Sequence, residues 1–241
     1  MTQRIAPIRD LDRRVVFVVA RGNKAPPRMV DTSIFIKVTT QLMAPPLVPE
    51  IRLHLATEIV PLWRKTEEEL EKEGVPPPYW AFAWAGGQAL ARYLLDHGAE
   101  AGSTLDFGSG SGLVAIAAAK AGAADVLAAD IDPFAAAAIA LNARENGISL
   151  DITTDDVIGR EGGWDVILVG DMCYERPLAD SLLAWLDKCA RAGATILMGD
   201  PGRTYFPKAG VEMLATYRVQ TTRELEDREI RETSVYRYRG A

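Results

Sequence analysis

The stretch LDFGSGSGLVAIAAA, residues 105–119, decides the fold of this chain. A short apolar strand ends at Asp106, and an alanine-rich helix follows it. Three glycines at alternate positions join the two: Gly108, Gly110 and Gly112. Glycines let a backbone turn tightly and let a ligand approach its N–H groups, and a helix N-terminus adds a partial positive charge. The loop therefore suits a nucleotide or a carboxylate-bearing ligand.

The segments around this loop repeat the same order of strand and helix. Strands are expected at 103–107, 125–130, 150–154, 164–170 and 194–199. Helices are expected at 49–73, 87–97, 111–121, 133–146 and 175–191. This alternation predicts an α/β fold, a parallel sheet with helices on both faces. Near the end, residues 216–223 and 229–238 alternate in polarity, which predicts an antiparallel hairpin added to the sheet.

The beginning of the chain does not follow this pattern. Residues 1–42 are basic and lack clear helical periodicity, so they are expected to form an extension of the domain that spans 43–241. We interpret the extension as a flexible arm or as sequence upstream of the true start. Two apolar runs within it, 15–20 and 34–38, are candidates for a pair of strands.

Composition excludes several classes of function. Of the 241 residues, 48% are hydrophobic and 25% charged, as in a soluble globular protein. The net charge of −6 argues against a nucleic-acid binder, and no apolar run is long enough to span a membrane. Two cysteines and two histidines do not have the number or spacing for a disulfide framework or a zinc cluster. We therefore expect no metal, and a reducing compartment such as the cytoplasm.

The glycine spacing separates two kinds of nucleotide-binding loop. The dinucleotide fingerprint G-x-G-x-x-G would place its third glycine at residue 113, which is Leu. The observed G-x-G-x-G, with an acid two residues before it, resembles motif I of the Rossmann-like S-adenosylmethionine-dependent methyltransferases. That resemblance implies a class I methyltransferase fold, with a mostly parallel seven-stranded sheet, and S-adenosylmethionine as the cofactor. In that family the loop wraps the methionine part of the cofactor.

An acid also ends the second predicted strand. A carboxylate at this place accepts hydrogen bonds from ribose hydroxyls in dinucleotide folds, and Asp130 is our candidate for that role. The neighbouring Asp132 precedes Pro133, so it is expected to cap the next helix. The resemblance places Ile131 beside the adenine.

A pair of acids follows the third predicted strand, in the stretch TTDDVIG. The resemblance implies that one of them meets the adenine amino group. Asp156 is the preferred residue, with Val157 contributing its backbone, and Asp155 is the alternative because the register is open by one residue.

The fourth strand ends in GDMCYE, residues 170–175, beside the first strand at the switch point of the sheet. Asp171 and Tyr174 are therefore expected where the methyl acceptor arrives. Their spacing, Asp-x-x-Tyr, resembles that of the seven-β-strand protein lysine methyltransferases, whereas amide and nucleobase methyltransferases have two prolines between the acid and the tyrosine. Asp171 is interpreted as an acceptor that orients the amine, or alternatively as the N-cap of the following helix.

A longer resemblance narrows the family. Four stretches are similar to the lysine methyltransferases of electron transfer flavoprotein beta subunit: PPPYWAFAWAGGQALARYLLDH, DFGSGSG, ADIDPFAAAAIALNARENG and GDMCYERPLADSLLAWLDKCARAG. The similarity covers about residues 45–241. It implies a protein substrate, lysines of that beta subunit, and a cofactor contact by Trp84. Trp80 is left open as a core or a channel residue. Nucleic acid and membrane are not expected as partners, and the protein is expected to be a monomer.

Two further readings stay open at this point. A ribosomal-protein methyltransferase has a similar glycine loop and DIDP stretch, although it resembles "NIL" after the fourth strand, where this chain has DMCY. A small-molecule N-methyltransferase is the other reading. A binding module without catalysis would not need the acid at residue 171.

Overall fold

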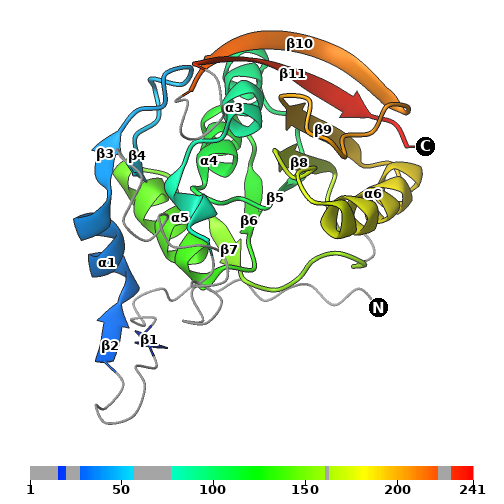
Figure 1. Cartoon of the computed structure of the whole chain (residues 1–241). Coiled ribbons are helices and arrows are strands. Elements are labelled where there is room, and N and C mark those ends of the chain that lie inside the picture. Colours follow the sequence, from blue (N-terminus) through cyan, green and yellow to red (C-terminus); the bar gives the residue numbers. More distant parts are fainter. Residues whose placement is uncertain (1–15, 20–27, 57–76, 161–162, 222–228, 241) are drawn as a thin grey trace.

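The computed structural model describes residues 16–19, 28–56, 77–160, 163–221 and 229–240. Its centre is a seven-stranded sheet in the order β10-β11-β9-β8-β5-β6-β7 (Figure 1). Five of the strands run parallel: β5 Ser103–Phe107, β6 Asp125–Ala129, β7 Asp151–Thr153, β8 Val166–Gly170 and β9 Thr195–Asp200. Three helices lie between consecutive strands: α4 Leu113–Lys120, α5 Pro133–Glu145 and α6 Arg176–Arg191. The predicted α/β fold is confirmed.

The order of the parallel strands reverses at β5. This strand pairs with β6 on one side and with β8 on the other. Ligands of open α/β sheets bind outside the carboxyl ends of the strands at such a switch point. The glycine loop after β5 and the GDMCYE stretch after β8 therefore open at the same edge of the sheet.

The predicted C-terminal hairpin is confirmed. Strand β11 (Ile230–Tyr238) pairs antiparallel with β9 and with β10 (Val211–Gln220), so the first strand of the hairpin begins at Val211 rather than at residue 216. The two strands complete the edge of the otherwise parallel sheet (Figure 1).

Alternate residues of each central strand face different helical layers. In β8, Val166 and Leu168 pack in a cluster with α3 (Ala85–His97), α4 and α5, whereas Ile167 and Val169 pack with α6. Both faces of a parallel sheet are buried in this way, which explains why β8 (VILVG) reads as an unbroken apolar run.

Two predictions before the glycine loop are wrong. The run 34–38 lies in helix α1 (Thr32–Thr39), while β1 (Val16–Val19) pairs instead with β2 (Arg28–Asp31). The helix expected at 49–73 does not begin there, because β4 (Leu53–Leu55) is a strand. Its partner is β3 (Gln41–Met43). Residues 57–73 of the expected helix lie outside the described residues.

Helix α1 contacts the domain rather than standing apart from it. Ile36 is fully buried in a cluster with Trp80 and Leu141, and the ring of Phe35 meets that of Phe134 at 5.7 Å between centroids. The division of the chain at residue 42 stays a prediction.

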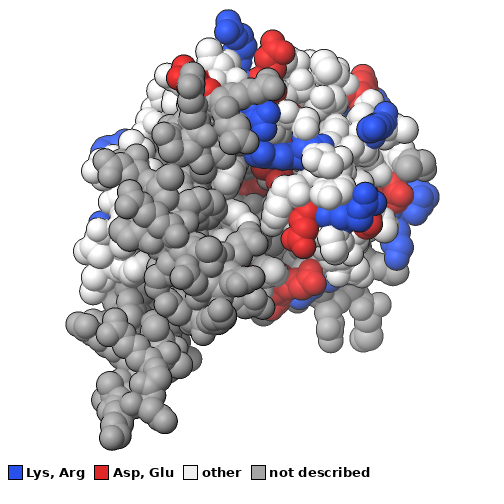
Figure 2. All heavy atoms as spheres, in the orientation of Figure 1, with Lys and Arg blue, Asp and Glu red and all other residues white. Residues whose placement is uncertain are grey.

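Acidic and basic side chains are interspersed over the described part of one face (Figure 2). Within the described ranges, no helix combines the length and the apolar content needed to cross a membrane.

Candidate functional site

A cavity of about 460 Å³ lies at the carboxyl ends of the parallel strands. Its size is that of a small-molecule or cofactor site. Its walls include most residues that the sequence singled out: Trp84, Gly108, Gly110, Asp130, Ile131, Asp155, Asp156, Val157, Asp171 and Tyr174. Segments far apart in the sequence thus meet around one space.

The glycine loop forms one wall of this cavity. Gly108, Gly110 and Gly112 all have positive φ, at 64°, 52° and 81°, which glycine adopts without strain. A Cβ on Gly108 would collide with the side chain of Met172. The loop therefore needs glycine for its turn, and at Gly108 it lies close to the Met172 side chain after β8.

Two of the predicted cofactor residues lie behind the loop and not on the cavity wall. The Asp106 carboxylate accepts hydrogen bonds from the Ser109 hydroxyl at 2.6 Å and from the Ala115 N–H at 3.0 Å. Burial raises its pKa to about 7. Gly112 is the N-cap of α4 and faces Ile139 of α5. In this structure these residues shape the loop, while their predicted cofactor role stays a prediction.

The acid after β6 holds the next turn. Asp130 accepts from the Gly110 N–H at 2.8 Å and from the Asp132 N–H at 3.0 Å, and burial raises its pKa. Asp132 caps α5 by accepting from the Phe134 N–H at 2.8 Å, as predicted. Ile131 between them is 73% exposed, which leaves an apolar surface at the cavity mouth.

The acids after β7 both line the cavity but differ in their contacts. Asp155 pairs with Arg160 at 3.1 Å, and Asp156 accepts from the Ile158 N–H at 2.9 Å. Val157, which follows the two acids, is buried. The preference for Asp156 at the adenine stays a prediction.

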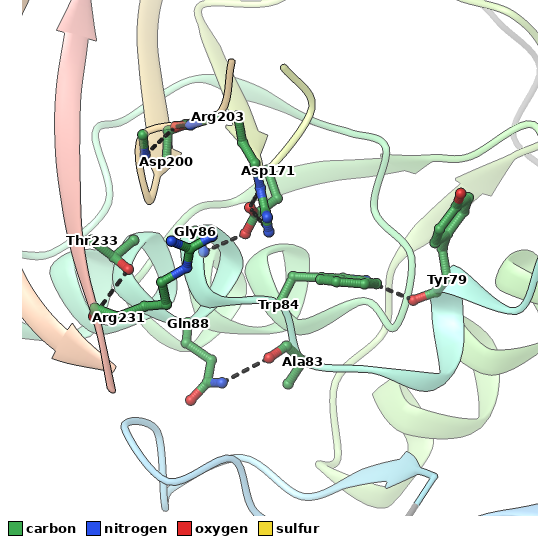
Figure 3. A network of polar contacts seen from close by, with 11 residues as sticks. Tyr79, Ala83, Trp84, Gly86, Gln88, Asp171, Asp200, Arg203, Arg231 and Thr233 are labelled. Carbon is green, nitrogen blue, oxygen red and sulfur yellow. Dashed lines mark hydrogen bonds and ion pairs between the residues drawn. The ribbon is translucent and has the colours of Figure 1, made fainter. Parts of the chain in front are cut away.

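Asp171 lies at the junction of three elements (Figure 3). Its backbone has a φ of 59°, a left-handed conformation that is uncommon outside glycine and that aspartate adopts more readily than most residues. One carboxylate oxygen accepts from the Gly86 N–H at the start of α3, and the other is 2.7 Å from both Nε and Nη2 of Arg203. Asp171 is not the N-cap of α6, since Glu175 takes that place, so that alternative is wrong.

Sequence reasoning missed Arg203. This residue lies on the loop after β9, and Asp200 holds the loop by accepting from the N–H groups of Gly202 and Arg203, both at 2.7 Å. The Arg203 guanidinium also lies over the Trp84 ring, 5.8 Å from its centroid. The signal in the sequence is the turn DPGR at the end of a strand, and many loops carry such a turn for their own geometry.

Aromatic rings form another part of the cavity wall. The ring of Tyr79 lies 6.0 Å from that of Trp84 and 5.7 Å from that of Tyr174. Trp84 donates its indole N–H to the Tyr79 carbonyl at 3.0 Å. Trp80 is both a core and a cavity residue, because it is 4% exposed, stacks on Phe134 and still lines the cavity.

The two groups with acidic protons after β8 stay neutral. Burial raises the pKa of the Tyr174 phenol and of the Cys173 thiol to about 12 each. Cys173 is also fully buried. A thiol in this state is no nucleophile, so the chemistry of the site must come from other groups.

These residues fit S-adenosylmethionine. The Asp130 carboxylate and the apolar side chains of Ile131 and Val157 line the cavity, as do Gly108 and Gly110 of the loop. The rings of Trp84 and Tyr174 suit a cation such as a sulfonium.

Comparison with known proteins agrees with this geometry. The chain is 42% identical over 213 residues to the electron transfer flavoprotein beta subunit lysine methyltransferase of Xenopus laevis, with 85% of each chain covered. It is 41% identical over 218 residues to that of Danio rerio, covering 86% of this chain and 83% of the relative. The family model of ribosomal protein L11 methyltransferase (PrmA) matches residues 88–171. The fold is similar to the crystal structure of ribosomal protein L11 methylase from Lactobacillus delbrueckii subsp. bulgaricus, with a TM-score of 0.51, 19% identity, and 83% of this chain and 100% of that chain covered.

Proposed function

The chain belongs to the family of the electron transfer flavoprotein beta subunit lysine methyltransferases, and we propose that it methylates lysines of that beta subunit. S-adenosylmethionine is the cofactor. One observation carries the proposal: the Asp171–Arg203 pair and the rings of Trp84 and Tyr174 face the same cavity as the glycine loop and Asp130. A cofactor and an acceptor side chain would therefore meet there.

The reaction makes two demands on this cavity. When bound, S-adenosylmethionine supplies a methyl group on a sulfonium. The acceptor takes this methyl group by an in-line displacement in which the sulfur is the leaving group. A lysine has a pKa of about 10.4 in water, so its amine must lose a proton before it attacks. The aromatic wall excludes water and lowers the pKa of a lysine that enters. Most of the rate gain would come from holding the amine in line.

The predicted residues divide into two groups in this mechanism. The first group is proposed to bind the cofactor and consists of Asp130, Ile131, Asp156, Val157, Trp84 and the loop glycines. Asp171 and Tyr174 are proposed to hold the acceptor amine, Asp171 as part of its pair with Arg203 and Tyr174 as a neutral phenol. Cation–π attraction at each ring would contribute about 0.5–2 kcal/mol while the amine is charged.

Methyl transfer into a cell extract tests this proposal. The extract comes from cells that lack the gene, the donor is S-adenosylmethionine with a tritiated methyl group, and the enzymes are wild type, Asp171→Ala and Asp180→Ala. Asp180 is exposed on α6 and serves as the matched control. We expect one labelled band at the size of the flavoprotein beta subunit with wild type and the control, and none with Asp171→Ala.

Ribosomal protein L11 is the second candidate substrate, because the L11 methyltransferase family model matches residues 88–171. Label on ribosomal proteins instead of the beta subunit would support it. Cofactor binding without any protein label would point to a small-molecule acceptor. We further propose that the protein acts as a monomer in the cytoplasm, where its cysteines, Cys173 and Cys189, stay free.

A further inference from the structure

We propose that Arg203 is a positioning residue that cancels the charge of Asp171, so that a lysine entering the cavity gives up its proton. The inference rests on the proposed lysine methylation. It goes beyond that proposal because it assigns the deprotonation of the acceptor to a charge pair instead of to a base.

The contacts of Asp171 make it a poor base. Its carboxylate accepts a backbone N–H at the start of α3, where the helix dipole favours an anion, and two N–H groups of Arg203 at 2.7 Å. The two side chains are 6% and 17% exposed. A carboxylate held by these donors keeps its negative charge and does not take up the proton of a lysine.

An isolated carboxylate at this place would oppose the reaction. An opposite charge within about 4–6 Å raises the pKa of an amine by roughly one to three units, which keeps the lysine protonated. Arg203 removes most of this effect, because its guanidinium lies against the same carboxylate and also lines the cavity. Desolvation in the cavity then meets less opposition and favours the neutral amine.

The loop after β9 fixes the guanidinium where it has this effect. Asp200 holds the backbone of Gly202 and Arg203, and the Trp84 ring lies under the guanidinium. Figure 3 shows Arg203, from the loop after β9, beside the Asp171 carboxylate, which also contacts Gly86 at the start of α3. Arg203 is therefore placed by one element and acts on the end of another.

Other ionisable groups around Asp171 do not replace Arg203. They are Cys173 and Tyr174 after β8, Asp200 at the end of β9, Tyr79 before α3 and Asp130 across the cavity. The Cys173 thiol and the Tyr174 phenol stay neutral in the working range, and neither Tyr79 nor the two acids can carry a positive charge. Among these groups, Arg203 supplies the positive charge.

The lysine ammonium releases one proton to water as it enters the cavity. The neutral amine forms the new N–C bond with its lone pair, and the bond from the methyl carbon to sulfur breaks with its electron pair left on sulfur. The product is a protonated methylamine and a neutral thioether.

The pH dependence of methylation separates this role from a purely structural one. With the flavoprotein beta subunit as substrate, the wild-type rate rises with pH as the bound amine deprotonates. In Arg203→Gln, Asp171 is uncompensated, so the rise should move up by about one pH unit or more, with a roughly tenfold loss at pH 7.5 that recovers at pH 9.5. Arg203→Lys should keep the wild-type profile.

The double variant Asp171→Asn with Arg203→Gln restores the net charge of the wild-type site. Its profile should return to within a few tenths of a unit of wild type, even if its rate is lower. Arg239→Gln is the control, because Arg239 forms an exposed pair with Glu212 away from the cavity. An Arg203→Gln rate that falls by the same factor at every pH would overturn the proposal, as would a loss of S-adenosylmethionine affinity in calorimetry.

A second readout does not depend on the protein substrate. The protein saturated with S-adenosylhomocysteine is titrated with n-butylamine, a model of the lysine side chain, at pH 7 and followed by NMR. Arg203→Gln should bind the butylammonium ion roughly tenfold more tightly than wild type, and the double variant should not. Equal affinity, or no binding by any variant, would refute the proposal. If instead wild type methylates no beta subunit while this titration succeeds, only the proposed substrate fails.

Discussion

The Asp130 carboxylate fixes the backbone of the glycine loop and of the turn after β6. It accepts two backbone N–H groups, of Gly110 and Asp132, while burial raises its pKa. Hydrogen bonds to charged groups contribute about 1.5–3 kcal/mol each. We expect Asp130→Ala to weaken S-adenosylhomocysteine binding by roughly 10- to 100-fold in calorimetry. Asp125→Ala, at the exposed start of the same strand, is the control and should bind normally.

Asp106 makes stability depend on pH in an unusual direction. Its pKa is about 7 in the folded protein, mainly through burial, and about 3.9 when unfolded. A group whose pKa is raised by folding stabilises the protein fully below pH 4, and this contribution is lost as pH rises to 7. Asp106→Asn has no such loss, and its amide oxygen accepts the same two bonds. Relative to wild type, it should therefore gain about 2–4 kcal/mol between pH 4 and 7.5 in urea unfolding. Equal pH slopes for the two proteins would contradict this.

Three of the acids predicted from sequence follow the carboxyl ends of parallel strands. Asp130, Asp156 and Asp171 were found because parallel strands bring their carboxyl ends to one edge. Arg203 was missed although it also follows a strand, because its partner Asp171 lies 32 positions away and only the folded chain joins them. The pattern shows which residues reach the edge, but not which of them pair.

Helix α3 packs against β9 through Gly86 and Gly199. This backbone contact brings the N-terminus of α3 next to the Asp171 carboxylate. A Cβ on Gly86 would collide with the Gly199 carbonyl, and a Cβ on Gly199 with the Gly86 carbonyl. Gly87, the next residue, has room: its Cβ would lie 3.8 Å from Val114. Gly86→Ala should therefore cost about 1–3 kcal/mol in unfolding free energy and lower methyl transfer, while Gly87→Ala should be nearly neutral. Equal effects of the two variants would show that the backbone contact is not what matters.

At the level of elements, prediction succeeded for strands that have a clear sequence pattern. It failed for segments whose secondary structure depends on the element they pair or pack with. The parallel strands carry buried apolar residues and end near glycines or acids, so their places were predicted within a few residues. Leu53–Leu55 and the apolar face of 34–38 are short and ambiguous. The first became a strand because Gln41–Met43 pairs with it, and the second a helix because Ile36 packs against α5.

The whole molecule raises the question of where its folded unit begins. The sequence places the boundary after residue 42, on the change in composition. The structure gives a physical argument for an earlier start, because Ile36 is fully buried beside Trp80 and Gln41–Met43 pairs with β4. Trp80 also lines the cavity, so this packing connects the beginning of the chain with the site.

Two shortened chains decide between these boundaries. One spans residues 32–241 and the other 43–241, so they differ only by α1 and the first part of β3. Removing the buried Ile36 alone should cost about 1.5–3 kcal/mol, and loss of the strand pairing adds to this. We expect the shorter chain to have the lower unfolding free energy in urea and a weaker affinity for S-adenosylhomocysteine, because Trp80 loses support on one side. If both chains were equally stable and bound equally well, the folded unit would begin after residue 42, as composition indicates.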